Sequence, residues 1–330
     1  MGAIARAHRA LLGLLRRCAK GGSVEITSKI VIVGAGGRLG AALMREYRNR
    51  FAVTGFNHAQ LDLGNLKQVR ATLAPLEFDL LINCAAQTNV DRCETHRDEA
   101  FLLNAEAPGV LAEICQARDA KLIHVSTDYV FDGEKREPYT EEDLAHPISV
   151  YGESKREGER RVLEGGHRHL VLRVSWVFGP DRHSFIDNIL QRAREHEALE
   201  AVADKFSTPT YTKDIAGILQ HVVAAVADPG ATVSDRSYSG ILHFAGAGSC
   251  SWQEYAQWAL DCCHSLGIPM KARTVGRLSL RDMKNFVAKR PVTTVLATGK
   301  YEQFAGKRPR DWHDAVAEYV RDYYSNTMAL

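Results

Sequence analysis

A tyrosine and a lysine four residues apart are the side chains of this chain best suited to acid–base chemistry. Tyr151 and Lys155 fall in Val150–Leu163, a segment predicted to be helical, so they should share one helix face. A free tyrosine phenol has a pKa near ~10, and a nearby ammonium group lowers that pKa by favouring the phenolate. Such a phenol can exchange a proton with a substrate oxygen while a hydride moves at carbon. The pair predicts redox chemistry at a ketone or alcohol carbon.

A hydroxyl that could hold the same oxygen lies upstream. Thr127 is the second residue after the predicted strand Lys121–Val125, and active sites of open α/β sheets gather at the carboxyl ends of strands. A hydroxyl there can hold a carbonyl oxygen beside the phenol. Tyrosine and lysine at this spacing also occur on solvated helices. The order of Thr127, Tyr151 and Lys155 nevertheless favours a catalytic trio.

A glycine-rich turn predicts a dinucleotide site. Gly34, Gly37 and Gly40 follow the predicted strand Ile30–Val33 and open a helical pattern. Glycine permits positive φ and lets the backbone approach a diphosphate closely, and the N-terminus of the helix offers unpaired N–H groups to the anion. The strand before this turn and the helix after it make a plain tight turn the weaker interpretation.

The residues after the second predicted strand bear on the choice of cofactor. An acid at the end of this strand usually binds the ribose 2′-hydroxyl of NAD, but Ala52–Phe56 is followed by Asn57 and His58. Arg38 in the turn could face a 2′-phosphate, because guanidinium–phosphate contacts are strong. The sequence therefore favours NADPH, with NADH as the alternative.

Strands alternate with helices, which predicts an α/β fold of the Rossmann type with a doubly wound parallel sheet. We expect a flexible extension over residues 1–28, a dinucleotide-binding domain over 29–180, and a smaller, mainly substrate-binding α/β part over 181–330 with some exchange of chain between the two. The predicted helices include Asn65–Leu73, Asp98–Arg118 with a division at Pro108–Gly109, Ser184–His196, Lys213–Ala227, Ser251–Leu260 and Trp312–Tyr324.

Composition narrows the class of protein. Lys and Arg number 42 against 40 Asp and Glu, giving a net charge of +2, so there is no electrostatic case for a nucleic-acid or membrane partner. No apolar run is long enough to cross a bilayer. Seven cysteines without a Cys-x-x-Cys pair predict free thiols, no metal site and a cytoplasmic location. The basic segment before Glu25 also fits an organelle transit peptide.

At the level of family, the chain resembles the dTDP-4-dehydrorhamnose reductases, which are extended short-chain dehydrogenase/reductases. The resemblance covers the chain from about Lys29 onward. The stretches that carry it are Asn83–Ala86, Thr88–Asp91, Ser126–Phe131, Val150–Lys155, Arg173–Trp176, Thr208–Thr210 and Lys289–Pro291. The basic extension, the loop Asp228–Gly240 and the pair Arg38–Leu39 depart from the family's usual pattern.

The resemblance implies roles for individual residues. Tyr151 would donate the proton, Lys155 would lower the tyrosine pKa and hold the nicotinamide ribose, and Thr127 would orient the keto oxygen. The implied substrate-binding residues are Thr127, Asp128, Tyr129 and Trp176. The implied cofactor-binding residues are Gly34, Gly37, Arg38, Leu39, Asp62, Leu63, Ala85, Ala86, Asn104, Tyr151 and Lys155.

The implied reaction reduces the C4 ketone of a nucleotide-linked 6-deoxysugar, dTDP-4-dehydro-L-rhamnose, in a protein that could form a homodimer. Two alternatives remain open. A nucleotide-sugar epimerase would use the same fold without net redox change. A non-catalytic subunit similar to the regulatory subunit of methionine adenosyltransferase would need no trio, so the intact Thr127, Tyr151 and Lys155 favour an enzyme.

Overall fold

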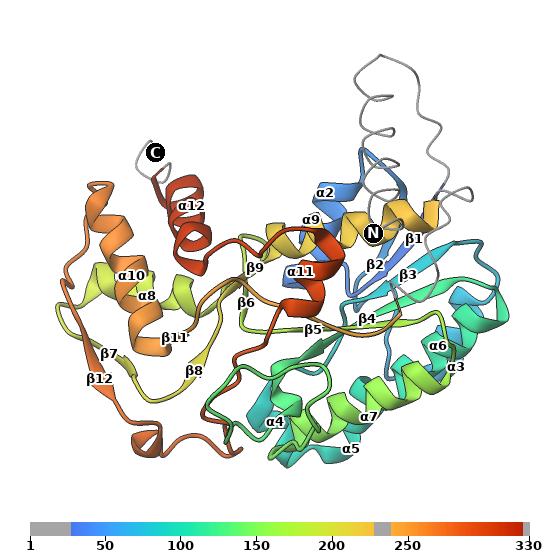
Figure 1. The fold of residues 1–330 in the computed structure, drawn as a ribbon, viewed down its shortest axis with the longest axis horizontal. Helices are drawn as coiled ribbons and strands as arrows, with labels where there is room; N and C mark the ends of the chain where they lie inside the picture. The colour runs from blue at the N-terminus through green and yellow to red at the C-terminus, as the bar shows by residue number, and fades with distance from the viewer. Residues whose placement is uncertain (1–27, 228–238, 326–330) are drawn as a thin grey trace.

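A six-stranded parallel sheet forms the centre of the larger part of the molecule (Figure 1). The computed structural model describes residues 28–227 and 239–325. The strands are β1 (Lys29–Val33), β2 (Ala52–Phe56), β3 (Leu80–Asn83), β4 (Lys121–Thr127), β5 (Leu170–Val174) and β10 (Gly240–Phe244). Their order is β10-β5-β4-β3-β1-β2, and every neighbouring pair is parallel. The predicted Rossmann-type fold is confirmed.

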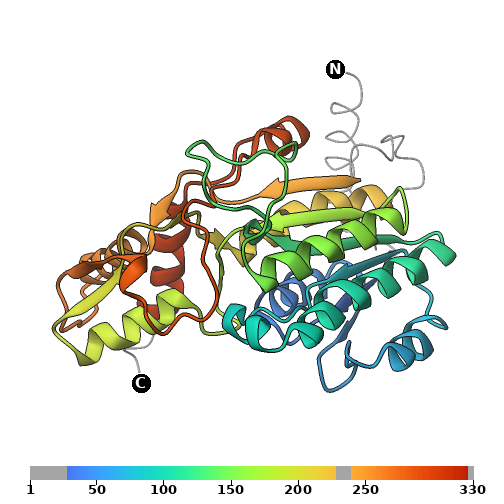
Figure 2. The ribbon, with the colours of Figure 1, turned by 90° about the horizontal axis from the view of Figure 1, so that it is seen from below.

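Successive residues of each strand point alternately toward the two faces of the sheet. Helical layers lie above and below the sheet in Figure 1, and Figure 2 looks onto the lower layer. Ile30 and Ile32 of β1 pack on one side, and Val31 and Val33 pack on the other. The first layer contains α2 (Arg38–Tyr47) and α9 (Thr212–Ala227), and the second contains α3 (Leu66–Leu73), α6 (Ala107–Ala117) and α7 (Val150–Glu164). Because both faces are covered, the strands are almost continuously apolar, which is typical of parallel sheets.

The segment predicted as a helix over Asp98–Arg118, with a division at Pro108–Gly109, consists of three helical pieces. These pieces are α5 (Arg97–Phe101), the π-helical turn η1 (Leu102–Glu106) and α6. The division precedes Pro108, because proline has no N–H and is tolerated only in the first turn of a new helix. The Ala107 N–H still donates to the Leu102 carbonyl, five residues back. The break at Pro108–Gly109 was therefore predicted a few residues late.

A smaller part holds the helices α8 (Phe185–Glu195), α10 (Trp252–Ser265) and α12 (Trp312–Tyr324). Short strand pairs surround them: β6 (Val177–Phe178) with β9 (Thr210–Tyr211), β7 (Leu199–Val202) with β12 (Val275–Leu278), and β8 (Phe206–Ser207) with β11 (Cys250–Ser251). The Ser251–Glu254 capping box that opens α10 is present as predicted. The helix continues beyond the predicted end at Leu260, because Cys263 extends its buried face.

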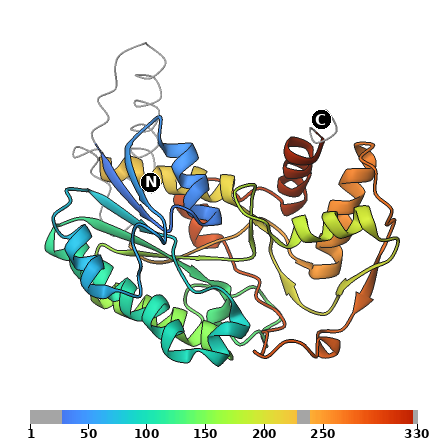
Figure 3. The ribbon, with the colours of Figure 1, turned by 180° about the vertical axis from the view of Figure 1, so that it is seen from behind.

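The chain returns to the sheet after it enters the smaller part. Helix α9 packs on α2, as Figure 3 shows from behind, and β10 pairs with β5 at the edge of the sheet, where Figure 2 shows it as an orange arrow. Residues 1–27 of the predicted extension and 228–238 of the predicted loop lie outside the described residues. No helix within the described ranges is long and apolar enough to span a membrane.

Candidate active site

A cavity of about 1080 Å³ lies at the carboxyl ends of the central strands. Its walls come from the turn after β1, the ends of β3 and β4, the start of α7 and the segment after β5. The predicted site residues that line it are Gly34, Gly37, Arg38, Leu39, Leu63, Ala85, Ala86, Thr127, Asp128, Tyr129, Tyr151, Lys155 and Trp176. The topology has therefore brought together side chains from widely separated parts of the sequence.

The glycine turn packs so closely that a side chain would not fit at two of its positions. Gly34 has φ +81°, and a Cβ atom there would lie 2.7 Å from the Ala85 nitrogen. A Cβ atom at Gly40 would lie 2.1 Å from the Gly34 carbonyl oxygen. Gly37 caps α2 without a side-chain hydrogen bond, which leaves the first N–H groups of the helix without a side-chain cap. These residues fit the predicted dinucleotide.

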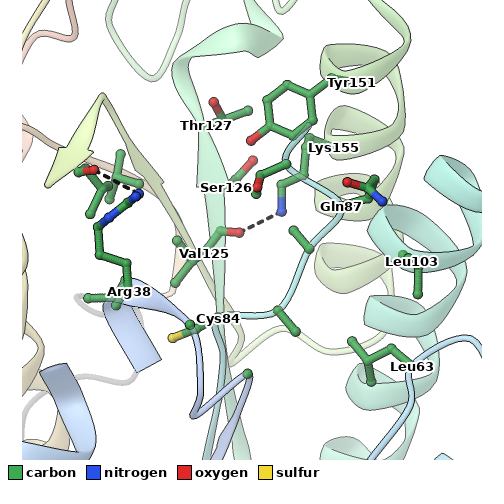
Figure 4. A pocket seen from close by; sticks show the side chains of 18 of the residues that line it. Arg38, Leu63, Cys84, Gln87, Leu103, Val125, Ser126, Thr127, Tyr151 and Lys155 are labelled. Atoms are coloured by element: carbon green, nitrogen blue, oxygen red, sulfur yellow. Dashed lines mark hydrogen bonds between the residues drawn. The ribbon is translucent and has the colours of Figure 1, made fainter. Parts of the chain in front are cut away.

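The start of α7 is fixed against the end of β4. Ser149 caps the helix by accepting from the Gly152 N–H, and Glu94 accepts from the Val150 N–H at 2.8 Å. A Cβ atom at Gly152 would lie 2.2 Å from the Tyr129 carbonyl oxygen, so only glycine allows this close approach. The side chains of Thr127, Tyr151 and Lys155 therefore lie together at one end of the cavity (Figure 4).

The phenol of Tyr151 is buried and protonated. Burial raises its pKa, and the hydrogen bond with Thr127 acts in the opposite direction. The lowering of this pKa by Lys155 stays a prediction, since the side chains that act on the phenol here are Thr127, Asp128 and Cys93. The ring lies edge-on to Tyr129, with centroids 5.7 Å apart. A buried, protonated phenol is suited to donating a proton.

The amine of Lys155 is held from the sheet side. Its Nζ donates to the Val125 carbonyl oxygen at 2.7 Å and lies 3.2 Å from Nε2 of His124 (Figure 4 shows the first contact). Burial lowers the pKa of Lys155 to about 8, while the charge of Glu159 opposes this shift. The amine can therefore change its protonation state close to neutral pH.

The predicted sugar side of the cavity contains a buried carboxylate beside a buried lysine. Asp128 accepts from Ser175 Oγ at 2.8 Å and from Thr127 Oγ1 at 3.1 Å. Burial raises the pKa of Asp128, and the charge of Lys205 opposes that effect. Lys205 Nζ lies 5.1 Å from the centre of the Tyr129 ring and donates to the Pro291 carbonyl. Lys205 was not predicted, because no local pattern distinguishes it from a surface lysine.

Trp176 adopts a conformation that is costly for a large side chain. Its φ is +39°, in the left-handed region. The indole packs against Phe185, Trp252 and Tyr255, with centroids 5.2, 5.9 and 4.7 Å away. Backbone strain of this kind persists only where surrounding contacts impose it, and it clusters at functional sites. Trp176 thus lines the cavity from the junction with the smaller part.

Arg38 lines the cavity, but its donors are directed at the protein. Its Nε, Nη1 and Nη2 donate to the carbonyls of Arg182, Val177 and His183. The predicted contact with a 2′-phosphate would require these hydrogen bonds to open. The guanidinium of Arg182 lies over the glycine turn instead, where Nε donates to the Gly36 carbonyl at 2.8 Å. A Cβ atom at Gly36 would be 4.0 Å from Arg182 Nη2 and 3.2 Å from Asn57 Cβ.

Two predicted cofactor residues lie outside the cavity lining. Asn104 is fully buried in η1. Its side-chain amide forms hydrogen bonds with the backbone N–H and carbonyl of Gln87 and with the hydroxyl of Ser154. It therefore positions the loop after β3 on α7 and does not face the cavity. Asp62 accepts from the Gly64 N–H in a local turn. Sequence reasoning could not distinguish these amide and carboxylate side chains from ligand contacts.

Several lining residues were not predicted as site residues: Asn57, His58, Cys84, Gln87, Leu103 and Arg182. No sequence motif marks Arg182 as a lining residue, because its position in the cavity depends on the path of the chain after β6. Within the described residues, no three His, Cys, Asp or Glu side chains gather as a metal site would require.

The sheet, the glycine turn and the Thr–Tyr–Lys trio define an oxidoreductase of the short-chain dehydrogenase/reductase class. The family described as RmlD substrate binding domain matches residues 28–325, and the chain belongs to it. The resemblance predicted from the sequence is confirmed.

Similar proteins span nearly the same length. The dTDP-4-dehydrorhamnose reductase of Aggregatibacter actinomycetemcomitans is 34% identical over 90% of this chain and 99% of its own. A probable dTDP-4,6-dihydroxy-2-methyloxan-3-one 4-ketoreductase of Streptomyces antibioticus is 36% identical over 88% of this chain and 94% of its own. The solved dTDP-4-dehydrorhamnose reductase of Bacillus anthracis, in complex with NADP, is 28% identical, with a TM-score of 0.81 over 90% of this chain and 99% of that one.

Proposed function

We propose that this chain uses NADPH to reduce the C4 ketone of a nucleotide-linked 6-deoxysugar, with dTDP-4-dehydro-L-rhamnose as the substrate and dTDP-L-rhamnose as the product. The observation that carries the proposal is the placement of Thr127, Tyr151 and Lys155 in one cavity with the glycine turn. The names of the relatives support a reductase of such sugars. They give no support to the epimerase or to the regulatory subunit.

The chain's own groups would carry out the proton chemistry. Reduced nicotinamide, when bound, supplies the hydride. Thr127 hydrogen-bonds the keto oxygen, and Tyr151 gives its phenolic proton to this oxygen as negative charge develops there. The ammonium form of Lys155 favours the phenolate that Tyr151 leaves behind. The high pKa of Tyr151 keeps its proton available for reduction at neutral pH.

NADPH is the favoured cofactor, and we assign its 2′-phosphate to Arg182 in preference to Arg38. The NADP complex of the Bacillus anthracis relative supports the choice of cofactor. Asn57 and Arg182 both lie beside Gly36, near the end of β2 where the adenosine ribose is bound in Rossmann folds. The side chain of Arg182 is exposed, so it can turn toward an anion without leaving a buried charge unpaired.

A substrate panel tests the proposal. The purified full chain is mixed with NADPH or NADH and a set of nucleotide-linked 4-keto-6-deoxysugars, and loss of reduced-nicotinamide absorbance is followed. We expect the fastest turnover with NADPH and dTDP-4-dehydro-L-rhamnose. Sugar inversion without cofactor consumption would favour the epimerase. No turnover with any sugar, together with tight binding of another enzyme, would favour the regulatory role. A homodimer and a cytoplasmic location stay predictions of the sequence.

A further inference from the structure

A buried histidine lies directly behind the amine of Lys155. His124 is in the middle of β4, opposite Asn83 of β3, and is fully inaccessible to solvent. Both of its ring nitrogens have partners: Nδ1 is 3.1 Å from the amide nitrogen of Asn83, and Nε2 is 3.2 Å from Nζ of Lys155. Neither His124 nor this chain of contacts has a role in the mechanism above.

The orientation of the Asn83 amide fixes the tautomer of the histidine. The Ala85 N–H donates to Asn83 Oδ1 at 3.1 Å, so the NH₂ group of Asn83 faces His124. An amide NH₂ group can only donate, and Nδ1 must therefore accept and carry no proton. Burial and the neighbouring Lys155 hold the pKa of His124 well below its usual range, so the ring is neutral. Its single proton then lies on Nε2, facing Lys155.

This tautomer favours the uncharged form of the lysine. An Nε2–H group can donate to Nζ only when the amine has a free lone pair, while Nζ keeps its own hydrogen bond to the Val125 carbonyl. A charged Lys155 would need Nε2 as an acceptor. The ring proton would then move to Nδ1, and the amide of Asn83 would have to turn over and lose the Ala85 N–H. Ala85 also lies against Gly34 of the glycine turn.

The other ionisable groups near Lys155 do not replace this control. Glu159 of α7 acts on Lys155 through its charge, but its oxygens accept from Arg173 and Ser126. Cys84, at the end of β3, is neutral at physiological pH because burial raises the pKa of its thiol to about 12. His124 is therefore in the best position to respond directly to the proton on Nζ.

We propose that His124 is a positioning residue which, oriented by Asn83, stabilises the neutral amine of Lys155 and so lets this side chain release a proton during turnover. The proposal rests on the proposed reductase function. Each reduction leaves Tyr151 as a phenolate. The ammonium group of Lys155 then gives one proton to Tyr151, which becomes a phenol again. The amine that remains on Lys155 accepts a hydrogen bond from His124 Nε2–H until water returns a proton to Lys155.

The tautomer can be tested without turnover. In the full chain labelled with ¹⁵N-histidine, long-range ¹H–¹⁵N spectra distinguish Nε2–H from Nδ1–H rings, and His124→Gln identifies the signal of residue 124. At about pH 10, where Lys155 is an uncharged amine, we expect the Nε2–H form. An Nδ1–H or doubly protonated ring at this pH would overturn the proposal while leaving the proposed reductase function intact.

Asn83→Asp tests the coupling to Lys155. One Asp oxygen can still accept from the Ala85 N–H, while the other requires a proton on His124 Nδ1 and so makes Nε2 an acceptor for the ammonium. We expect the alkaline fall of kcat/KM to move up by about one pH unit. The exposed N-cap variant Asn89→Asp should leave it in place.

A double-mutant cycle separates the histidine from the added charge. If His124 carries the effect, the shift caused by Asn83→Asp should fall by at least half in the His124→Gln background. An equal shift in both backgrounds would assign it to the carboxylate charge alone and overturn the proposal. If the unaltered chain reduces none of the sugars although His124 has the expected tautomer, the proposed reductase function is contradicted instead.

Discussion

The two ends of the cavity differ sharply in their exposure to water. At one end Thr127, Tyr151 and Lys155 are all at least nine-tenths buried. At the other end Asn57, His58 and Arg182 are exposed. A buried group interacts strongly with its neighbours and pays a large desolvation cost, whereas an exposed ion pair contributes little.

This contrast predicts how substitutions divide between rate and affinity. Changes at the buried end should act on the proton chemistry and therefore on kcat. Changes at the exposed end should act on how tightly one cofactor is held relative to the other. The glycine turn joins the two ends and should affect both.

The largest effect is expected for Tyr151→Phe. The ring keeps its packing against Tyr129, but the proton donor is lost, and general acid catalysis contributes about 10²–10⁴-fold to a rate. We expect kcat to fall by this factor, while NADPH binding measured by fluorescence changes little. A variant that turns over at the normal rate would show that another group protonates the substrate.

Gly34→Ala should weaken both cofactor binding and folding. Alanine at φ +81° costs about 1–3 kcal/mol, and its Cβ atom would press against the Ala85 nitrogen. Thermal unfolding and NADPH titration measure the two losses. The matched control is Gly217→Ala in α9, where no atom beyond the adjoining backbone of the helix lies within 4 Å of the new Cβ. Gly217→Ala should leave the thermal stability unchanged or raise it. Equal losses of stability and NADPH affinity in both variants would show that Gly34 has no special role.

The rate of reduction should depend on the protonation of Lys155. The pKa of Lys155 is lowered to about 8, so its ammonium form predominates below that pH and disappears as the pH rises through it. Reduction at saturating NADPH should therefore fall about tenfold for each pH unit well above 8. A rate that stays constant up to pH 10 would contradict the role given to the ammonium form.

The smallest effect is expected at the exposed end. Arg182→Ala should raise the KM for NADPH about fivefold, corresponding to about 1 kcal/mol for an exposed charged contact, and leave the KM for NADH unchanged. Arg38→Ala removes hydrogen bonds to three carbonyls and should weaken both cofactors alike. If Arg38→Ala alone discriminates between the cofactors, the 2′-phosphate belongs to Arg38, as the sequence predicted.

Local patterns were enough to predict the sheet and the buried end of the cavity. Each of the patterns used spans only a few residues: the apolar run Ile30–Val33, the glycine turn and the Tyr151–Lys155 spacing. The order of the strands then brings the predicted elements together at one edge of the sheet. The error over residues 98–118 is also local, because periodicity does not distinguish a π-helical turn from a continuous α-helix.

Contacts that depend on distant segments could not be predicted. Arg182 reaches Gly36 across a separation of 146 residues, and Arg38 finds its carbonyl partners in the same distant segment. Asn104 was predicted to contact the cofactor because its sequence neighbourhood does not reveal the Gln87 backbone that it bonds. The pKa of Tyr151 depends on the depth of burial, which spacing along a helix does not fix.

The return of β10 to the sheet also has a consequence for synthesis on the ribosome. Among residues 28–227 and 239–325, the outer edge of β5 is paired only by Gly240–Phe244, far along the chain. Until they emerge, the nascent dinucleotide-binding half presents an unpaired strand edge, which is a template for pairing with other chains. Chains truncated before residue 240 should therefore aggregate, even though they contain every residue of the catalytic trio.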